Sequence, residues 1–322
     1  MLVDLDLSKP GKHFYDLTPV AGELAGITGD VMCCIANGEG PTLLLCGGIH
    51  GDEYEPQTVL RQLAETLEPE QISGRLIIIP AINYPAAQSG ARISPFDGQN
   101  MNRMFPGLMG GTPTQRLAAF VTEQLFPFCD LLIDAHTGGN EVCVVPMIFG
   151  FSSEACLMGE DKLITLMEAW GYQYIQHVTG VPSTICGAAL AAGVASVEIE
   201  GGGGSLDSRE VATIREGILR ALAAAGVMQP VLAEKPFNGV HVDAGPEAQL
   251  LAPQTGIVEH LVSLHDRVKE GSVVAHLYPL HGDNAAPLAL KAPVGGVVLR
   301  QTRSAFAKEG QLVMNLGVVR TG

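Results

Sequence analysis

Residues 41–56 read PTLLLCGGIHGDEYEP. A short apolar run ends in two glycines, and a histidine and several acidic residues follow before a helical pattern begins. Continuous apolar runs of this length, bounded by Gly or Pro, are typical of strands that are covered on both faces. We therefore expect a buried strand that ends at the glycines and leads into a helix.

The same strand pattern recurs along the first two thirds of the chain. Further apolar runs lie at 74–80, 130–135 and 194–199, and helical stretches are expected at about 55–67, 114–125, 154–169 and 208–225. Thr112 before Pro113 has the pattern of an N-cap followed by proline at the first helical position. This alternation predicts an α/β domain with a mostly parallel or mixed sheet and helices on both faces.

The pattern changes after about residue 232, where short β-like stretches separated by glycines replace the helical periodicity. An internal repeat is visible: APQTGIV at 252–258 with KEG at 269–271, and APVGGVV at 292–298 with KEG at 308–310. Two such copies predict two similar β units related by a pseudo-two-fold axis. We predict an α/β domain over 1–232 and an all-β domain over 233–322. The latter resembles the barrel-sandwich of lipoyl and biotinyl carrier domains, but Lys291 lacks the setting of a modified lysine.

Charge and composition exclude several classes of partner. The net charge is −15, which does not favour binding to nucleic acid or to an anionic membrane. The sequence contains no apolar run of about 18 residues, so we expect no transmembrane helix. The N-terminal residues do not have the pattern of a signal peptide. The 7 scattered cysteines form no CxxC pair, so we expect reduced cysteines and a cytoplasmic protein.

Two glycine-flanked strand ends carry residues that could bind a metal. His50 and Glu53 follow the first run, and His136 follows the run at 130–135. Ligands bind at the carboxyl ends of strands in open α/β sheets, and two imidazoles with one carboxylate suit a catalytic zinc ion. Either histidine alone would more often be an ordinary turn or strand-end residue. Together with Glu53 they predict a zinc site, in which Asp134 could accept a hydrogen bond from His136.

These motifs resemble those of the zinc carboxypeptidase superfamily, in the succinylglutamate desuccinylase and aspartoacylase branch. GGIHGDE matches the glycine-rich element with its His-x-x-Glu spacing, and Asp134 with His136 matches the later Asp-x-His element. The resemblance covers most of the chain. It implies one zinc per chain and hydrolysis of the amide bond of a small N-acyl amino acid by a metal-activated water. It also allows a homo-oligomer.

The resemblance also implies roles for residues outside the metal motif. Arg92 would polarise the scissile carbonyl and stabilise the oxyanion, and Asn102 and Arg103 would hold the substrate carboxylate, which arginine can bond at two points. Glu200, followed by two glycines, matches the Glu-x-Gly element of the general base, and Glu198 remains the alternative.

Two other functions remain open at this point. The first is a metallocarboxypeptidase that cleaves peptides with the same chemistry, although the appended β domain argues against it. The second is a non-catalytic ligand-binding relic of the fold. Retention of the complete set of His, Glu and Arg residues argues against a relic.

Overall fold

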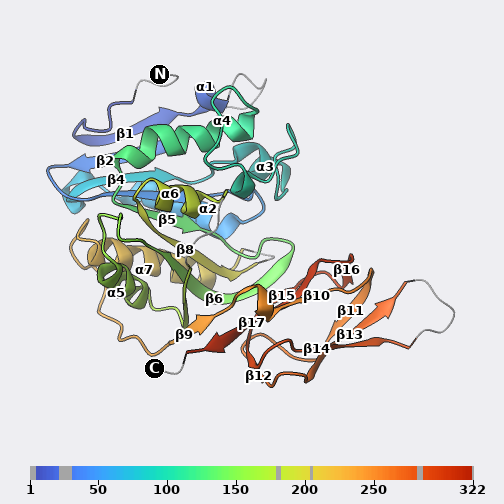
Figure 1. Ribbon diagram of the computed structural model, residues 1–322. Coiled ribbons are helices and arrows are strands. Elements are labelled where there is room, and N and C mark those ends of the chain that lie inside the picture. Colours follow the sequence, from blue (N-terminus) through green and yellow to red (C-terminus); the bar gives the residue numbers. More distant parts are fainter. Residues whose placement is uncertain (1–4, 22–30, 179–182, 204–205, 281–285, 321–322) are drawn as a thin grey trace.

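A computed structural model describes residues 5–21, 31–178, 183–203, 206–280 and 286–320. Its centre is a mixed sheet that runs through the N-terminal two thirds of the chain (Figure 1). In spatial order its strands are β1 (Gly11–Asp16), β2 (Val31–Asn37), β4 (Gly74–Ile79), β3 (Thr42–Gly47), β5 (Leu131–Ala135), β8 (Ala195–Gly202), β6 (Val142–Phe151) and β7 (Tyr174–His177).

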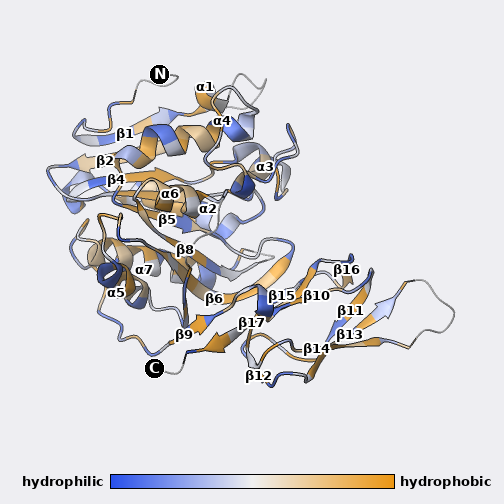
Figure 2. Cartoon of the chain, viewed as in Figure 1, coloured by the Kyte–Doolittle hydropathy of each residue, from blue (hydrophilic) through white to orange (hydrophobic). Residues whose placement is uncertain are grey.

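The four strands expected from apolar runs are all present, as β3, β4, β5 and β8. They are mutually parallel neighbours in the order β4-β3-β5-β8, so their carboxyl ends meet at one edge of the sheet. Antiparallel pairs flank them, since β2 joins β4 and β6 joins β8. The α/β class with a mixed sheet is therefore confirmed, and its central strands are largely apolar (Figure 2).

Helices cover both faces of this sheet. One apolar core lies under α2 (Tyr54–Thr66), α5 (Glu160–Trp170) and α7 (Ser208–Ala224). A second core lies under α1 (Thr18–Ala21), α4 (Pro113–Phe120) and α6 (Ile185–Ala191). The structure also contains α3 (Tyr84–Ser89) and short helical turns η1 (Pro69–Gln71), η2 (Met101–Arg103), η3 (Val121–Leu125) and η4 (Phe126–Phe128).

The helix boundaries largely follow the sequence pattern. The Thr112 side chain accepts a hydrogen bond from the Gln115 amide and Pro113 opens α4, so the expected N-cap is confirmed. Helix α5 begins at Glu160, six residues later than expected from 154, because Gly159 has the extended backbone of an N-cap (φ −64°, ψ 160°).

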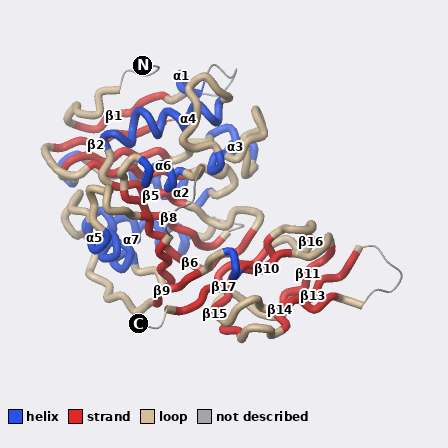
Figure 3. Tube along the Cα trace, viewed as in Figure 1, coloured by secondary structure: helices blue, strands red, loops and turns tan. Residues whose placement is uncertain are grey.

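Strands dominate the chain beyond residue 232 (Figure 3). The described residues there form β9 (Val240–Asp243), η5 (Pro246–Ala248), β10 (Gln249–Leu251), β11 (Gly256–His260), β12 (Arg267–Val268), β13 (Val273–Pro279), β14 (Leu288–Lys291), β15 (Gly296–Thr302), β16 (Phe306–Ala307) and β17 (Leu312–Val319). The two repeats exchange partners: β11 of the first pairs with β16 of the second, and β12 of the first with β15 of the second. This pairing is what a pseudo-two-fold relation requires. The likeness to a lipoyl domain stays a prediction, and residues 281–285 of the segment between the repeats lie outside the described residues.

The C-terminal strands are joined to the central sheet by backbone pairing. β9 pairs in parallel with β7 and also contacts β17, and β15 pairs with the first residues of β6. The predicted boundary at 232/233 stays a prediction, although β9 beyond it extends the central sheet.

Two further expectations concern membranes and thiols. Over the described residues, no helix has the length and apolar character to cross a bilayer. All 7 cysteines are unpaired, and all except Cys143 are buried.

Candidate metal centre and active site

The loop between β3 and α2 presents two of the predicted metal ligands. Glu53 is the N-cap residue of α2, and His50 lies three residues before it. Both side chains are buried. Gly48 has φ +68°, which favours glycine, and a Cβ on Gly51 would overlap the backbone of Ala86 and Ala87. The glycines of this motif therefore let the loop fold tightly against α3.

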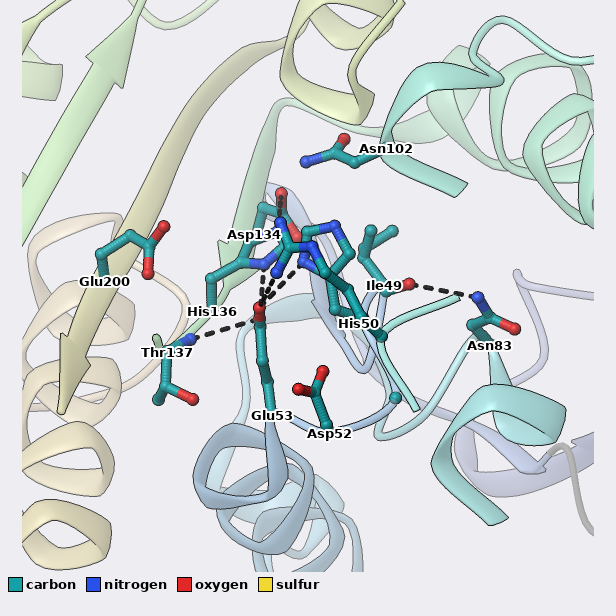
Figure 4. Close-up of polar contacts among 12 residues, drawn as sticks. Ile49, His50, Asp52, Glu53, Asn83, Asn102, Asp134, His136, Thr137 and Glu200 are labelled. Atoms are coloured by element: carbon teal, nitrogen blue, oxygen red, sulfur yellow. Dashed lines mark hydrogen bonds and ion pairs between the residues drawn. The ribbon is translucent and has the colours of Figure 1, made fainter. Parts of the chain in front are cut away.

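The third predicted ligand arrives from the neighbouring strand. β3 and β5 pair in parallel with Cys46 opposite Asp134, so His136 emerges beside the loop that follows β3. Figure 4 shows Glu53 between the two imidazoles. His50 Nδ1 lies 2.9 Å from Glu53 Oε1, and His136 Nδ1 lies 2.7 Å from Glu53 Oε2. Ligand atoms of the three residues lie within 4.8 Å of one another, so this group could hold one metal ion.

The outer nitrogen of each imidazole faces an oxygen. His136 Nε2 lies 2.9 Å from Asp134 Oδ2, and His50 Nε2 lies 3.2 Å from Asn100 Oδ1. An oxygen that accepts a hydrogen bond from Nε2 keeps the imidazole proton on that nitrogen. The lone pair of Nδ1 is then available to bind a metal. The donor set and its supporting oxygens thus fit a divalent metal ion. Asp134 was expected in this position, whereas Asn100 was not, because only its place in the polar stretch at 97–103 pointed to it.

The charged side chains of this group shift one another's pKa. Burial raises the pKa of Glu53, but the imidazoles of His136 and His50 outweigh it and hold that pKa far below the usual range. Burial lowers the pKa of His136, but Asp134 and Glu53 outweigh it and raise it well above its usual value. Two carboxylates, those of Asp134 and Glu53, therefore act on His136, and such negative charge favours a bound cation.

Arg92 lies at the same centre. Its Nη1 donates to Glu53 Oε1 at 3.1 Å, and its Nε lies 3.5 Å from Glu141 Oε2. The structure therefore brings Arg92 to the predicted metal group, with 29% of its side chain exposed to solvent.

The two predicted substrate-binding residues differ in burial. Asn102 is buried near His50 (Figure 4), and its Oδ1 accepts a hydrogen bond from the Ile185 amide at 3.0 Å. Arg103 is exposed, and its Nη1 donates to the Asn102 carbonyl. Asn102, within η2, is thus tied to the first residue of α6, whereas Arg103 extends towards solvent.

Both candidates for the general base lie on β8 and, being two residues apart, share a face. Glu198 is paired in register with Asp134, and together with Cys186 they form a group behind His136. Glu200 stands at the end of β8, where Arg300 Nη2 donates to its Oε1 at 3.0 Å. Burial raises the pKa of Glu200, and Arg300 offsets part of that shift. Sequence reasoning did not find Arg300, which lies in the second β repeat without any local motif.

The chain also matches known proteins over most of its length. Residues 39–225 match the model of the succinylglutamate desuccinylase/aspartoacylase catalytic domain. The chain is 32% identical over 287 residues to the N-alpha-acetyl-L-2,4-diaminobutyric acid deacetylase of Halomonas elongata, covering 87% of this chain and 82% of that protein.

Two solved structures have the same fold over nearly the full length. One is the product-bound ectoine utilization protein EutE (DoeB) of Ruegeria pomeroyi, with a TM-score of 0.86, 29% identity and 98% of each chain covered. The other is a succinylglutamate desuccinylase/aspartoacylase from Rhodobacter sphaeroides, with a TM-score of 0.88, 29% identity and 100% of each chain covered. From the catalytic-domain match and the curated relative, the chain belongs to the succinylglutamate desuccinylase/aspartoacylase family.

Proposed function

We propose that this chain is a zinc-dependent amidohydrolase that removes an acyl group from the nitrogen of a small amino-acid-like substrate. The observation that carries this proposal is the convergence of His50, Glu53 and His136, with an oxygen acceptor behind each imidazole. Arg92 and Glu200 stand beside that group, and the curated relative is a deacetylase of an N-acetylated amino acid.

The metal would be held by His50, Glu53 and His136, one ion per chain. Two imidazoles and a carboxylate are the ligands of many catalytic zinc sites. When bound, zinc polarises a carbonyl and lowers the pKa of a water molecule in its open position. The other steps fall to side chains of the protein.

Glu200 acts in this proposal as the general base. Its carboxylate accepts the proton of the attacking water and returns it to the departing amine nitrogen. Arg92 donates hydrogen bonds to the carbonyl oxygen as negative charge develops there. Glu198 is less suited to this part, because it faces Asp134 behind His136.

Asn102 and Arg103 bind the carboxylate of the substrate in this proposal. The guanidinium of Arg103 can bond a carboxylate at two points, and its exposure leaves it accessible to a ligand. We favour an N-acetyl over an N-succinyl substrate because the Halomonas relative is a deacetylase. No specific observation favours a peptidase or a non-catalytic binding protein.

We further propose that residues 1–232 form the hydrolase domain and residues 233–322 a β domain of the barrel-sandwich type, adjacent to the site. The pairing of β15 with β6 and the contact of Arg300 with Glu200 support that adjacency. The unpaired cysteines support a cytoplasmic location. The net charge of −15 supports a small-molecule substrate rather than nucleic acid or a membrane, and a homo-oligomer is compatible with this proposal.

The test combines metal content and hydrolysis on one preparation. Wild type, His50→Ala and the control His276→Ala, on the distant strand β13, are assayed with N-acetyl and N-succinyl amino acids, including N-acetyl-2,4-diaminobutyrate, and with blocked dipeptides. We expect about one zinc per chain and deacylation in the wild type and the control, both lost in His50→Ala. A wild type that binds no zinc and hydrolyses nothing after zinc is added would contradict the proposal. Cleavage of the dipeptides alone would favour a peptidase.

A further inference from the structure

Arg300 and Glu200 form an ion pair between two parts of the chain that lie far apart in sequence. Arg300 Nη2 donates to Glu200 Oε1 at 3.0 Å, and 26% and 13% of the two side chains are exposed. Such partial exclusion from water strengthens a charged hydrogen bond. The contact brings a residue of the second β repeat to the proposed general base.

The backbone explains why the two side chains meet. β6 lies between their strands, and Val144 of β6 is paired with Gly202 of β8 on one side and with Arg300 of β15 on the other. The Arg303 amide also donates to the Glu141 carbonyl at 2.9 Å, which anchors the end of β15 beside the site. The position of Arg300 is therefore set by strand pairing rather than by a loop.

The guanidinium of Arg300 has contacts on two sides, whereas only one oxygen of Glu200 has a hydrogen-bond partner among the described residues. The guanidinium of Arg300 lies over the ring of Phe149, 5.3 Å from its centroid, which restrains it from a second side. Glu200 Oε2 is buried and has no hydrogen-bond partner among the described residues, whereas Oε1 is held by Arg300. One oxygen of the carboxylate is thus fixed and the other is free to accept a proton.

Other charged groups act on Glu200 without holding it. Glu53, His136 and Arg92 influence its carboxylate through space, and Glu198 precedes it by two residues on the same strand. None of these four side chains forms a hydrogen bond with the Glu200 carboxylate. Within the described part of the chain, Arg300 is therefore the side chain that can orient it.

We propose that Arg300 is a positioning residue for the general base Glu200, an inference that rests on the proposed hydrolase function. It holds Oε1, so that Oε2 faces the reacting water. The C-terminal β region thereby completes the active site by supplying a side chain, besides packing near it. A different role, in which Arg300 binds the substrate carboxylate, predicts a change in KM instead.

Kinetics of Arg300→Gln and Arg300→Lys test the positioning role, with Arg267→Gln on the neighbouring strand β12 as a control. Misplacement of a catalytic group costs about 10- to 100-fold in rate, so we expect that loss in kcat for Arg300→Gln with KM within about 3-fold. Arg300→Lys should recover part of kcat, since an ammonium can donate to Oε1. Unchanged kcat, or a loss confined to KM, would overturn the proposal.

A thermal double-mutant cycle tests the contact without any turnover. Melting temperatures of Arg300→Gln, Glu200→Gln and the double variant should be non-additive, because each single change removes the same ion pair. Additive shifts would show that the two side chains do not interact and would overturn the inference. A wild type inactive on every substrate would instead contradict the proposed function. If Arg300→Gln fails to fold, Arg300→Met, which also removes the ion pair, replaces it in both measurements, with the same criteria.

Discussion

His136 Nε2 lies 2.9 Å from Oδ2 of Asp134, which stands two residues earlier and is fully buried. This carboxylate fixes the proton on Nε2 and turns Nδ1 towards Glu53. We predict that Asp134→Asn lowers zinc affinity by about 10- to 100-fold, as changes to such supporting carboxylates do. Titration with a competing chelator measures the affinity. Asp161→Asn, exposed on α5, is the control, and equal affinities in the two variants would contradict the prediction.

Gly51 directly follows His50 in the loop that leads to Glu53, and it lies against α3. A Cβ at Gly51 would overlap the backbone of Ala86 and Ala87, so Gly51→Ala must displace the loop that carries both ligands. We predict loss of bound zinc together with destabilisation by about 1–3 kcal/mol. Gly110→Ala is a matched control, because its Cβ would meet nothing within 4 Å. Metal analysis and denaturant unfolding check both effects, and a Gly51→Ala variant that behaves like the control would refute the prediction.

Substitutions of the two carboxylates of β8 are predicted to affect the activity differently. Glu200→Gln should lower kcat by about 10²- to 10⁴-fold, the range expected for removal of a general base. Glu198→Gln should keep most of the activity, because Glu198 faces Asp134 instead. Steady-state kinetics with the best N-acetyl substrate distinguish the two. The reverse pattern would assign the base to Glu198.

The raised pKa of Glu198 predicts that the stability of the protein depends on pH. Burial raises its pKa to about 7, with His136 opposing the shift and Asp134 and Glu200 adding to it. Because the folded protein then binds this proton more tightly than the unfolded chain, Glu198 stabilises the fold fully below about pH 4.5. That contribution to the free energy of unfolding is lost as the pH rises towards 7, by about 1.4 kcal/mol per pH unit between the two pKa values.

Urea unfolding from pH 4.5 to 8 measures this contribution. Glu198→Gln cannot ionise, so its stability relative to wild type should improve as the pH rises through that window. A constant difference between the two proteins across the window would show that Glu198 does not titrate there.

The sequence predicted the central strands and the convergence of the candidate metal ligands for the same physical reason. Strands buried on both faces are continuous apolar runs, and parallel strands gather their carboxyl ends at one edge. His50 and His136 could therefore be placed together although they follow different strands. The flanking strand β6 was not predicted, because Pro146, the one exposed residue of the strand, interrupts the apolar run.

Asn100 and Arg300 could not be found from the sequence. Asn100 stands among other polar residues of one loop, and nothing in the pattern shows which of them faces His50. Arg300 reaches Glu200 across β6, and that contact depends on the register of β15 against β6. Such pairings join distant segments, whereas periodicity and motifs describe only neighbouring residues.

Arg103 and Asn102 are predicted to respond differently to substitution, although they are adjacent. Arg103 is exposed, so Arg103→Gln should fold normally and raise KM by about 10- to 100-fold through loss of a charged hydrogen bond to the substrate. Asn102→Ala removes the acceptor of the Ile185 amide, and a buried unpaired amide costs about 1–3 kcal/mol of stability. Arg209→Gln, exposed on α7, controls for loss of charge.

Kinetics and thermal unfolding of the three variants separate these effects. An N-acetyl amine that lacks the carboxylate provides a further check, because Arg103→Gln should leave its hydrolysis unchanged while that of the N-acetyl amino acid weakens. If both substrates weaken equally in Arg103→Gln, the residue does not recognise the carboxylate. In that case the guanidinium would serve the η2 turn through its bond to the Asn102 carbonyl, and substrate recognition would have to come from other residues.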